Sequence, residues 1–361
     1  MSTNVTPAAV ESALADFKDP ETGRSAVKMG QVSHVQASPG KISLTLALAS
    51  HSAPLWKDAQ EAAVQKLRGK FPDVREVEVN LVLLDRPAGK LGQIGLTVKS
   101  VIAVGAGKGG VGKSTIAASL AFGLERAGCK VGLMDADVFG PSIPHLVGLA
   151  DSPKPEVVDG KIEPIRLPSG MPVMSMGFMI PKGEAVIWRG PMLHGAITNF
   201  LRDTRWGDLD YLIIDMPPGT GDIPLTLSQM LPLTGAVVVG TPQEIALLDV
   251  VKAIAMFRKV NIPVLGMVEN MSGFVSPDTG KRFDIFGAGG ARARAEELDV
   301  PFLGEVPIVI QIRVNGDAGK TAANFDDPQT APFLAGICYR LVRNLADSTA
   351  AAPPMPSLPV L

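Results

Sequence analysis

The first 84 residues alternate between two kinds of hydrophobic pattern. Apolar residues recur at helical spacing in residues 8–17 and 56–71, and at every second position in residues 41–49 and 75–84. A period near 3.6 residues predicts an amphipathic helix, and a period of two predicts a strand with one buried face. We therefore predict a small α+β domain over residues 1–84.

Two later stretches lack such a period and are rich in residues that interrupt regular structure. Residues 85–99 contain one proline and three glycines, and residues 347–361 contain several prolines. Such compositions are typical of linkers and loose termini. The first stretch is predicted to be an interdomain linker and the second a proline-rich tail.

Residues 100–346 contain short apolar runs separated mostly by helical spans. SVIAVGA, YLIID and GAVVVG are three of these runs. Buried strands that alternate with helices are typical of a mostly parallel sheet with helices on both faces. The pattern predicts an α/β fold with a doubly wound sheet, preceded by the small α+β domain.

Composition limits the classes of partner. The chain has 361 residues, 46% of them apolar, and its 34 Lys and Arg nearly balance its 36 Asp and Glu. A balanced charge favours neither nucleic acid nor an anionic membrane, and no apolar run approaches the roughly 18 residues of a membrane span. The two cysteines, Cys129 and Cys338, form no paired motif. We expect a cytoplasmic protein in a reducing compartment.

GKGGVGKST matches the phosphate-loop pattern G-x-x-x-x-G-K-[ST] and lies between a predicted strand and a predicted helix. Glycines let backbone N–H groups turn toward phosphate oxygens, which a mere strand-to-helix turn would not require. The predicted nucleotide contacts are Gly107, Lys108, Gly109, Gly110, Val111, Gly112, Lys113, Ser114 and Thr115. We expect Lys113 to act catalytically on the β- and γ-phosphates of ATP, and the Ser114 hydroxyl to bind Mg²⁺.

Aspartates follow two of the apolar runs. Asp135 and Asp137 end one run, and Asp215 ends another. Carboxylates at the carboxyl ends of parallel strands face the ligand crevice, so Asp215 is predicted to bind Mg²⁺, directly or through water. A helix cap or solvated loop is the alternative for any single aspartate, and it stays open for Asp135 and Asp222.

The early lysine makes the loop resemble the deviant Walker A motif of the MinD, ParA, ArsA and nitrogenase iron-protein class. The resemblance implies a homodimer in which Lys108 reaches the partner's nucleotide as a catalytic residue; a solvated loop lysine is the alternative. It also implies that Asp137 positions the attacking water and that the loop at 217–222 senses the γ-phosphate. Asn270 and Pro307 resemble adenine contacts, although a strand-end asparagine is often a turn residue.

Longer stretches resemble the Mrp/ApbC family of iron–sulfur cluster carrier ATPases. VGLMDADVFGPSIPHLVGL, AVIWRGPMLHGAITNFL and GMVENMSGF carry the likeness, which runs from about Val98 to Leu345. In the first domain, DPETGRSAVKMG is similar to the small iron–sulfur assembly domain. The resemblance implies ATP-dependent transfer of an iron–sulfur cluster to apoproteins, with apoprotein clients or assembly proteins as partners.

The usual cluster ligands of that family are a Cys-x-x-Cys pair after the ENMS motif. This chain has Ser276-Pro277-Asp278-Thr279 there, and Ala53 stands where relatives often have another cysteine. Hydroxyls are poor ligands for iron–sulfide units, which prefer thiolates. The sequence therefore identifies no cluster ligands, and Cys129 and Cys338 are interpreted mainly as buried packing residues.

Two functional hypotheses follow. The first is an ATP-hydrolysing cluster carrier with unusual ligands, which come from other residues, from the two cysteines of paired subunits or from a partner. The second is a nucleotide-switched scaffold or regulator that has lost cluster binding. A MinD-like spatial organiser lacks support because no basic membrane-binding or DNA-binding segment is present, and a kinase lacks a substrate motif.

Overall fold

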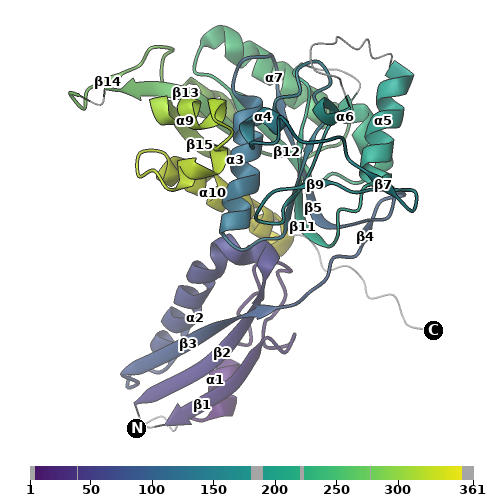
Figure 1. The fold of residues 1–361 in the computed structure, drawn as a ribbon. Helices are drawn as coiled ribbons and strands as arrows, with labels where there is room; N and C mark the ends of the chain where they lie inside the picture. Colours follow the sequence, from purple (N-terminus) through teal and green to yellow (C-terminus); the bar gives the residue numbers. More distant parts are fainter. Residues whose placement is uncertain (1–4, 39, 180–189, 220–222, 277, 352–361) are drawn as a thin grey trace. The chain divides into compact units, whose positions relative to one another are not determined.

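The computed structural model describes residues 5–38, 40–179, 190–219, 223–276 and 278–351. Contacts divide the chain into two compact units (Figure 1). One contains Met1–Arg86 with Val342–Leu361, and the other contains Pro87–Leu341. The last helix, α10 (Ala331–Ala351), contributes residues to both units.

The first unit is a three-stranded sheet with helices on one face. Its elements are α1 (Pro7–Ala13), β1 (Val32–Ser38), β2 (Lys41–Ala49), the 3₁₀ helix η1 (Ser50–Leu55), α2 (Trp56–Lys70) and β3 (Glu76–Leu84). The central strand β2 pairs antiparallel with β1 and parallel with β3. Its alternating leucines and Ile42 are buried against the helices. Period-two alternation thus directs one face of β2 into the core, as predicted.

The second unit is built on a mostly parallel sheet. Its strands are β4 (Lys90–Leu91), β5 (Leu96–Ala106), β6 (Val131–Asp135), β9 (Ile165–Arg166), β10 (Pro172–Ser175), β11 (Leu209–Asp215), β12 (Gly235–Gly240), β13 (Val264–Val275), β14 (Arg282–Phe283) and β15 (Phe302–Ile308). The order is β14-β13-β12-β5-β11-β6-β10-β9, with β15 beside β13 and β4 beside β5. Only β4, β9 and β14 pair antiparallel among the described strands of this sheet. The predicted fold class is confirmed.

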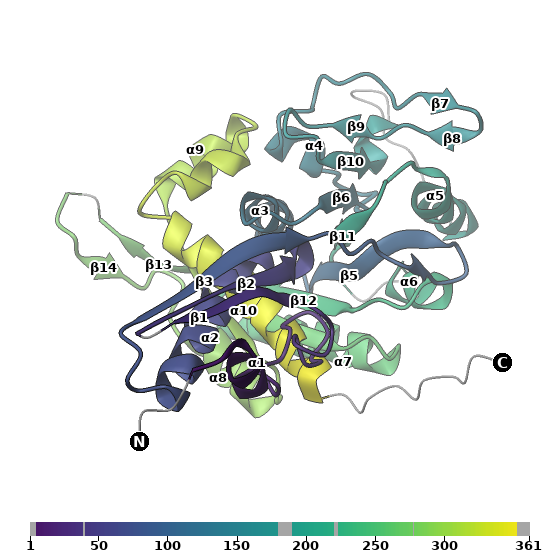
Figure 2. The ribbon, with the colours of Figure 1, turned by 90° about the horizontal axis from the view of Figure 1, so that it is seen from below.

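Helices cover both faces of this sheet. They are α3 (Lys113–Arg126), α4 (Ile143–Leu146), α5 (Gly190–Asp203), α6 (Ile223–Met230), α7 (Glu244–Lys259), α8 (Gly290–Glu297) and α9 (Ile310–Asp317). Short elements are β7 (Val157–Val158), β8 (Lys161–Ile162), η2 (Met176–Phe178) and η3 (Thr321–Phe325). One apolar cluster contains residues of α5, α6, α7 and α8 together with alternate residues of the strands. Helix α3 packs on the opposite face of the sheet (Figure 2). The strands are buried on both faces, which explains their continuous apolar runs.

Two regions differ from the predicted organisation. Residues 85–99, expected to be a linker, contain β4 and the first residues of β5, because Leu96 and Val98 are buried at alternate positions. Residues 347–351, expected to belong to the tail, continue α10, since the first helix-breaking residue is Pro353. Residues 352–361 lie outside the described part of the chain. Among the described helices, none has the length and apolar character needed to cross a membrane.

Candidate functional site

The phosphate loop connects β5 to α3, as the motif requires. Gly110 and Gly112 both have φ of 81°, a left-handed conformation that side chains disfavour. Gly112 caps α3, whose first backbone N–H groups therefore open onto the loop. The result is a concave run of N–H groups at the positive end of a helix, which suits phosphate.

Gly107 is required by packing as well as by the motif. A Cβ at this position would lie 2.1 Å from the Asp249 carbonyl oxygen on α7. Backbone atoms of a helix cannot yield as a flexible side chain can. The start of the loop therefore packs directly against α7.

Lys113 lies at the centre of the site. Its Nζ donates to Asp215 Oδ1 at 2.6 Å and to Ser114 Oγ at 3.2 Å, and lies 3.4 Å from Asp137 Oδ2. The Lys113 side chain is only 7% exposed, and that of Asp215 is fully buried. The structure thus brings four predicted residues from three separate segments, Lys113 with Ser114, Asp137 and Asp215, into contact.

Strand register explains why carboxylates from different strands lie close together. In the parallel pairing of β11 with β6, Asp215 lies opposite Asp135, and in its pairing with β5 it lies opposite Val104. Three neighbouring strands therefore end at one edge of the sheet, beside the phosphate loop. This is the edge where ligands bind in open α/β sheets.

Burial governs the protonation of two aspartates. It raises the pKa of Asp215, and the Lys113 ammonium opposes this rise. Burial, with the nearby charge of Asp215 as second cause, raises the pKa of Asp135 to about 8. A buried carboxyl beside another carboxylate favours its neutral form.

The acidic edge has oxygen atoms that fit a magnesium ion. Asp215 Oδ2 is buried and has no hydrogen-bond partner among the described residues. An unpaired buried carboxylate oxygen is costly unless a cation or donor reaches it. Together with the neighbouring Ser114 hydroxyl it forms a hard-oxygen donor pair of the kind Mg²⁺ prefers.

Asp137 forms a tight turn at the end of β6. Its Oδ1 accepts from the backbone N–H groups of Phe139 and Gly140, both at 3.3 Å. Asp135 Oδ1 in turn accepts from the Asp137 N–H at 3.0 Å. Backbone N–H groups therefore hold one carboxylate oxygen of Asp137, while the other oxygen faces Lys113.

Ser175, at the end of β10, was not predicted to belong to the site. Its hydroxyl donates to Asp135 Oδ2 at 2.9 Å and accepts from the Gly177 N–H at 2.9 Å. Asp135 Oδ2 also accepts from Ile143 N–H, which begins α4. In the sequence, this serine directly follows the apolar run PVM, and a polar residue at the end of a predicted strand could have indicated its place in the site.

Lys108 is separated from the Lys113 cluster. It is half-buried and makes no hydrogen bond or ion pair within the described part of the chain. The adjacent Gly109 and Gly110 are exposed, and Thr115 is half-buried in the first turn of α3. The Asp222 position lies outside the described residues.

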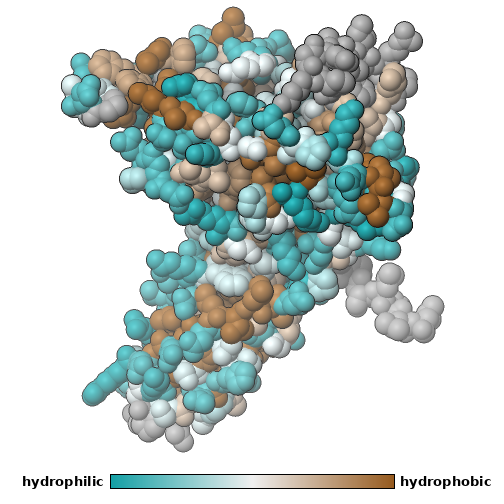
Figure 3. Space-filling model, viewed as in Figure 1, coloured by the Kyte–Doolittle hydropathy of each residue, from teal (hydrophilic) through white to brown (hydrophobic). Residues whose placement is uncertain are grey.

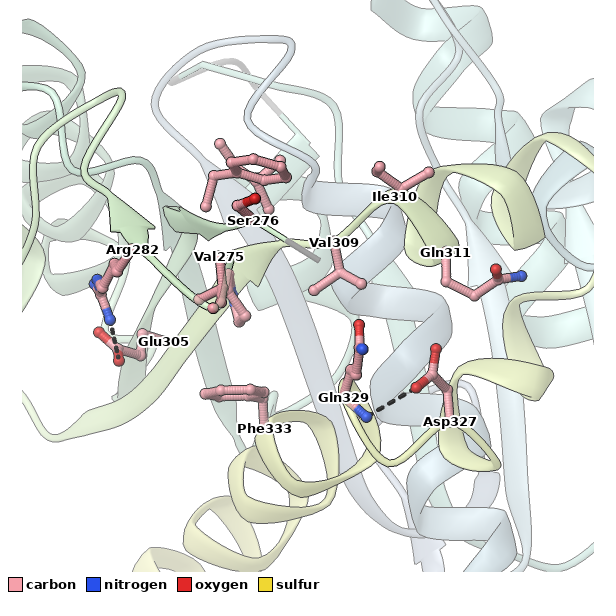
Figure 4. A pocket seen from close by; sticks show the side chains of 14 residues that line it. Val275, Ser276, Arg282, Glu305, Val309, Ile310, Gln311, Asp327, Gln329 and Phe333 are labelled. Carbon is pink, nitrogen blue, oxygen red and sulfur yellow. Dashed lines mark hydrogen bonds and ion pairs between the residues drawn. The ribbon is translucent and has the colours of Figure 1, made fainter. Parts of the chain in front are cut away.

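Asn270 and Pro307, the predicted base contacts, lie on neighbouring strands, since Asn270 pairs with Val306. The Asn270 side-chain amide contacts the phosphate loop itself, donating from Nδ2 to the Val111 carbonyl oxygen at 2.8 Å. Pro307 instead lines a pocket of about 600 Å³ (Figure 4). Asn270 therefore contacts the phosphate loop, whereas Pro307 lines this separate pocket.

The pocket lies between the β13–β14 hairpin, the start of α9 and the start of α10. Val275 and Ser276 come from the hairpin, Val309 and Ile310 from the other wall, and Phe333 closes one end (Figure 4). Apolar side chains continue onto the surface over the end of β13 and α9 (Figure 3). The pocket is thus mainly apolar, with a few polar groups at its edge.

The hairpin carries hydroxyl side chains, Ser276 and Thr279, where the family resemblance implies a Cys-x-x-Cys pair. The Ser276 N–H donates to the Lys281 carbonyl at 2.9 Å, and Thr279 Oγ1 accepts from the Lys281 N–H at 3.4 Å. Pro277 lies outside the described residues, and Ala53 lies in η1. Within the described ranges, no three His, Cys, Asp or Glu side chains form a group that could hold a metal.

Both cysteines are packing residues. Cys129 is 5% exposed and Cys338 is 3% exposed. A Cβ built on Gly123 of α3 would lie 2.4 Å from Cys338 Sγ, so the thiol occupies the space that glycine leaves. Burial raises the pKa of the Cys338 thiol to about 12. Neither sulfur offers an accessible thiolate for a cluster.

Comparison with known proteins gives two family matches. Residues 97–342 match the family described as NUBPL iron-transfer P-loop NTPase, and residues 7–81 match the family described as iron-sulfur cluster assembly protein. The iron-sulfur cluster carrier protein of Deinococcus radiodurans is 46% identical, over 86% of this chain and 87% of its own length. That of Escherichia coli K12 is 40% identical, over 95% and 91%.

Solved structures agree with this assignment. A nucleotide-binding protein of Archaeoglobus fulgidus in complex with ADP is 42% identical, with a TM-score of 0.56 over 64% of this chain and 90% of that chain. The Aquifex aeolicus MinC:MinD complex, 17% identical with a TM-score of 0.50 over 67% and 95%, shares the fold. The family resemblance inferred from the sequence is confirmed: the chain belongs to the NUBPL iron-transfer P-loop NTPase family.

Proposed function

We propose that this protein binds and hydrolyses ATP and uses that cycle to carry an iron–sulfur cluster to apoproteins. The observation that carries the nucleotide half is the contact of Lys113 with Ser114, Asp137 and Asp215 at the phosphate loop. The carrier half is supported by family membership and by relatives that are named iron-sulfur cluster carrier proteins.

Each residue of the site has a separate task in the proposed reaction. Phosphate oxygens compete with the carboxylates for the Lys113 ammonium, which then neutralises charge on the β- and γ-phosphates. Ser114 and Asp215 would hold Mg²⁺, which supplies further positive charge to the same phosphates when bound. Asp137 accepts a hydrogen bond from the attacking water and so orients it in line with the γ-phosphate.

The base end of ATP is proposed to enter the pocket beside Pro307. Asn270 contacts the phosphate loop and pairs with Val306, the residue before Pro307, which supports a path for the nucleotide from the loop toward this pocket. An apolar pocket with a few polar groups at its edge suits a purine ring. Asn270 and Pro307 are the proposed base contacts.

Lys108 is proposed to act in trans across a homodimer. Its lack of a partner in the described part of its own chain, on a loop with exposed glycines, supports a role outside the subunit. A cation placed against the partner's γ-phosphate would stabilise the charge that develops during transfer, as an arginine finger does.

Lys108→Ala tests this role. We expect ATP turnover to fall roughly 10²- to 10³-fold and ATP-dependent dimerisation to weaken, while ATP still binds the monomer. Steady-state turnover and sedimentation velocity with and without ATP are the measurements. Lys320→Ala, which changes a lysine away from the loop, is the control. Unchanged turnover and dimerisation in the Lys108 variant would show that Lys108 is a solvated loop lysine.

A nucleotide-switched scaffold without a cluster is the second candidate. The observation that favours it is that Ser276 and Thr279 stand where the family resemblance implies two thiols, while both cysteines are buried. Serine and threonine hydroxyls do not replace thiolates on iron–sulfide units. A carrier with this sequence must therefore use ligands from a partner or an unusual residue set.

Anaerobic reconstitution with iron and sulfide discriminates the two candidates. If the protein is a carrier, the full-length chain should retain stoichiometric iron and sulfide after desalting and show charge-transfer absorption. Ser276→Cys/Thr279→Cys is the positive control, because it restores the thiolate pair. Iron retained by this double variant alone would remove the carrier function from the isolated protein and favour the scaffold.

A further inference from the structure

Asn270 is held rigidly by its surroundings. Between the pairs Asn270–Val306 and Phe274–Ile308, β13 advances four residues while β15 advances two, so β13 bulges. Met271 has a left-handed φ of 59°, which is uncommon outside glycine. A residue at the start of such a bulge has little freedom to move.

Its neighbours Glu269 and Ser272 anchor the bulge on both sides. The fully buried Glu269 carboxylate accepts from the Ser272 hydroxyl at 2.5 Å and from the Ala291 N–H at 2.7 Å, where α8 begins. The Ser272 hydroxyl oxygen also lies 3.1 Å from Glu305 Oε2 on β15, so its single proton is shared between the two carboxyl groups. These buried hydrogen bonds fix the backbone that presents Asn270.

The Asn270 amide fits against the phosphate loop at one peptide. Its Nδ2 donates to the Val111 carbonyl at 2.8 Å in a buried position. A Cβ on Gly112 would lie 2.1 Å from that same Nδ2. Glycine at position 112 therefore serves a second purpose, because any side chain there would push the amide away from the loop.

Engaging this carbonyl has a geometric consequence for the next N–H group. The Val111 carbonyl and the Gly112 N–H belong to one planar trans peptide, so they point in opposite directions. A carbonyl held toward β13 turns the N–H away from β13. In phosphate loops, N–H groups directed into the concave side bind the phosphate oxygens.

We propose that Asn270 is a positioning residue for the phosphate loop: its amide orients the Val111–Gly112 peptide so that the Gly112 N–H faces the nucleotide phosphates. This rests on the proposed ATP site and adds a phosphate-side role to the base contact proposed above. Base contact alone would leave binding of a phosphate chain without a base unaffected.

Inorganic tripolyphosphate, a phosphate chain without a base, provides the test. In Asn270→Ala the dissociation constants of Mg·ATP, Mg·GTP and Mg·tripolyphosphate should all rise by about tenfold, as expected for the loss of one buried hydrogen bond. Asn270→Asp should weaken all three further, because a carboxylate cannot donate and repels the carbonyl. Tripolyphosphate has no base, so its loss of affinity reports on the phosphate side alone.

Gln60→Ala is the matched control, because Gln60 also donates a side-chain amide to a backbone carbonyl, that of Val79 at 2.6 Å, in the first unit. It should bind all three ligands as the wild type does. Unfolding midpoints show whether the variants are folded. If Asn270→Ala does not fold, the nearly isosteric Asn270→Asp variant provides the test. Wild-type tripolyphosphate affinity in both Asn270 variants would overturn the proposal. Failure of the wild-type protein to bind ATP would instead refute the proposed function.

Discussion

Lys113→Ala should abolish measurable ATP hydrolysis and weaken ATP binding by at least about a hundredfold, because charged hydrogen bonds to phosphate contribute roughly 1.5–3 kcal/mol each. Lys113 is the one predicted residue that contacts both carboxylates of the site, at 2.6 Å to Asp215 and 3.4 Å to Asp137. Isothermal titration with ATP and a steady-state phosphate-release assay measure the two effects.

The same variant should also lose stability without nucleotide. Removing one partner of a buried ion pair costs about 3–5 kcal/mol, because the other charge stays buried. Burial already raises the pKa of Asp215 and Lys113 opposes that rise, so the variant raises this pKa further. Folded Asp215 in the variant then keeps a proton that the unfolded chain releases, so the variant loses stability as pH rises above about 4, the unfolded carboxyl value. The deficit relative to the wild type grows once the pH exceeds the already raised pKa of wild-type Asp215.

Lys99→Ala is the matched control for both effects. Lys99 lies on β5 at the end distant from the loop, and its Nζ is 3.0 Å from Oδ1 of the buried Asp210 on β11. It should lower stability while ATP affinity stays at the wild-type level. Full ATP turnover by Lys113→Ala, or a stability loss that shrinks with rising pH in denaturant titrations, would contradict the proposed arrangement.

Gly107→Ala should destabilise the second unit by about 3 kcal/mol and weaken ATP binding, although it adds one methyl group. The added Cβ would lie 2.1 Å from the Asp249 carbonyl oxygen and 2.2 Å from the carbonyl carbon. The loop must therefore move away from α7, which shifts every N–H group that follows. Chemical unfolding and ATP titration measure the two losses.

Gly109→Ala separates this steric effect from the general cost of replacing a loop glycine. Among the described residues, a Cβ on Gly109 would meet only Pro218 Cγ at 3.9 Å, an ordinary contact distance. Its unfolding free energy should stay within about 0.5 kcal/mol of the wild type. Equal stability of the two alanine variants would mean that the loop is not seated on α7 as described.

The sequence predicts those parts of the site that form continuous motifs. The loop from Gly107 to Thr115 is local, and Asp137 and Asp215 follow apolar runs whose parallel pairing brings their ends together. Hydrophobic period and motif spacing depend on neighbours along the chain, so one sequence is sufficient to read them.

Contacts between distant segments were not predictable in this way. The Asn270 amide meets a carbonyl 159 positions away, and Ser175 meets Asp135 across 40 positions. No local pattern encodes either contact, because each contact depends on which strands become neighbours and on the register of their pairing. The early start of β5 was missed for a related reason: glycines at 92 and 95 suggest a linker, but the pairing of Val98 with Leu209 on the distant strand β11 overrides them.

The depth at which both sulfur atoms are buried has a practical consequence for handling the protein. Cys129 and Cys338 are the chain's only thiols, and each is almost inaccessible. Oxidants act on exposed thiolates, so air should leave both cysteines unmodified. Any sensitivity to oxygen that appears after loading would then report on the cargo, which makes aerobic inactivation a direct indicator of whether cargo is present.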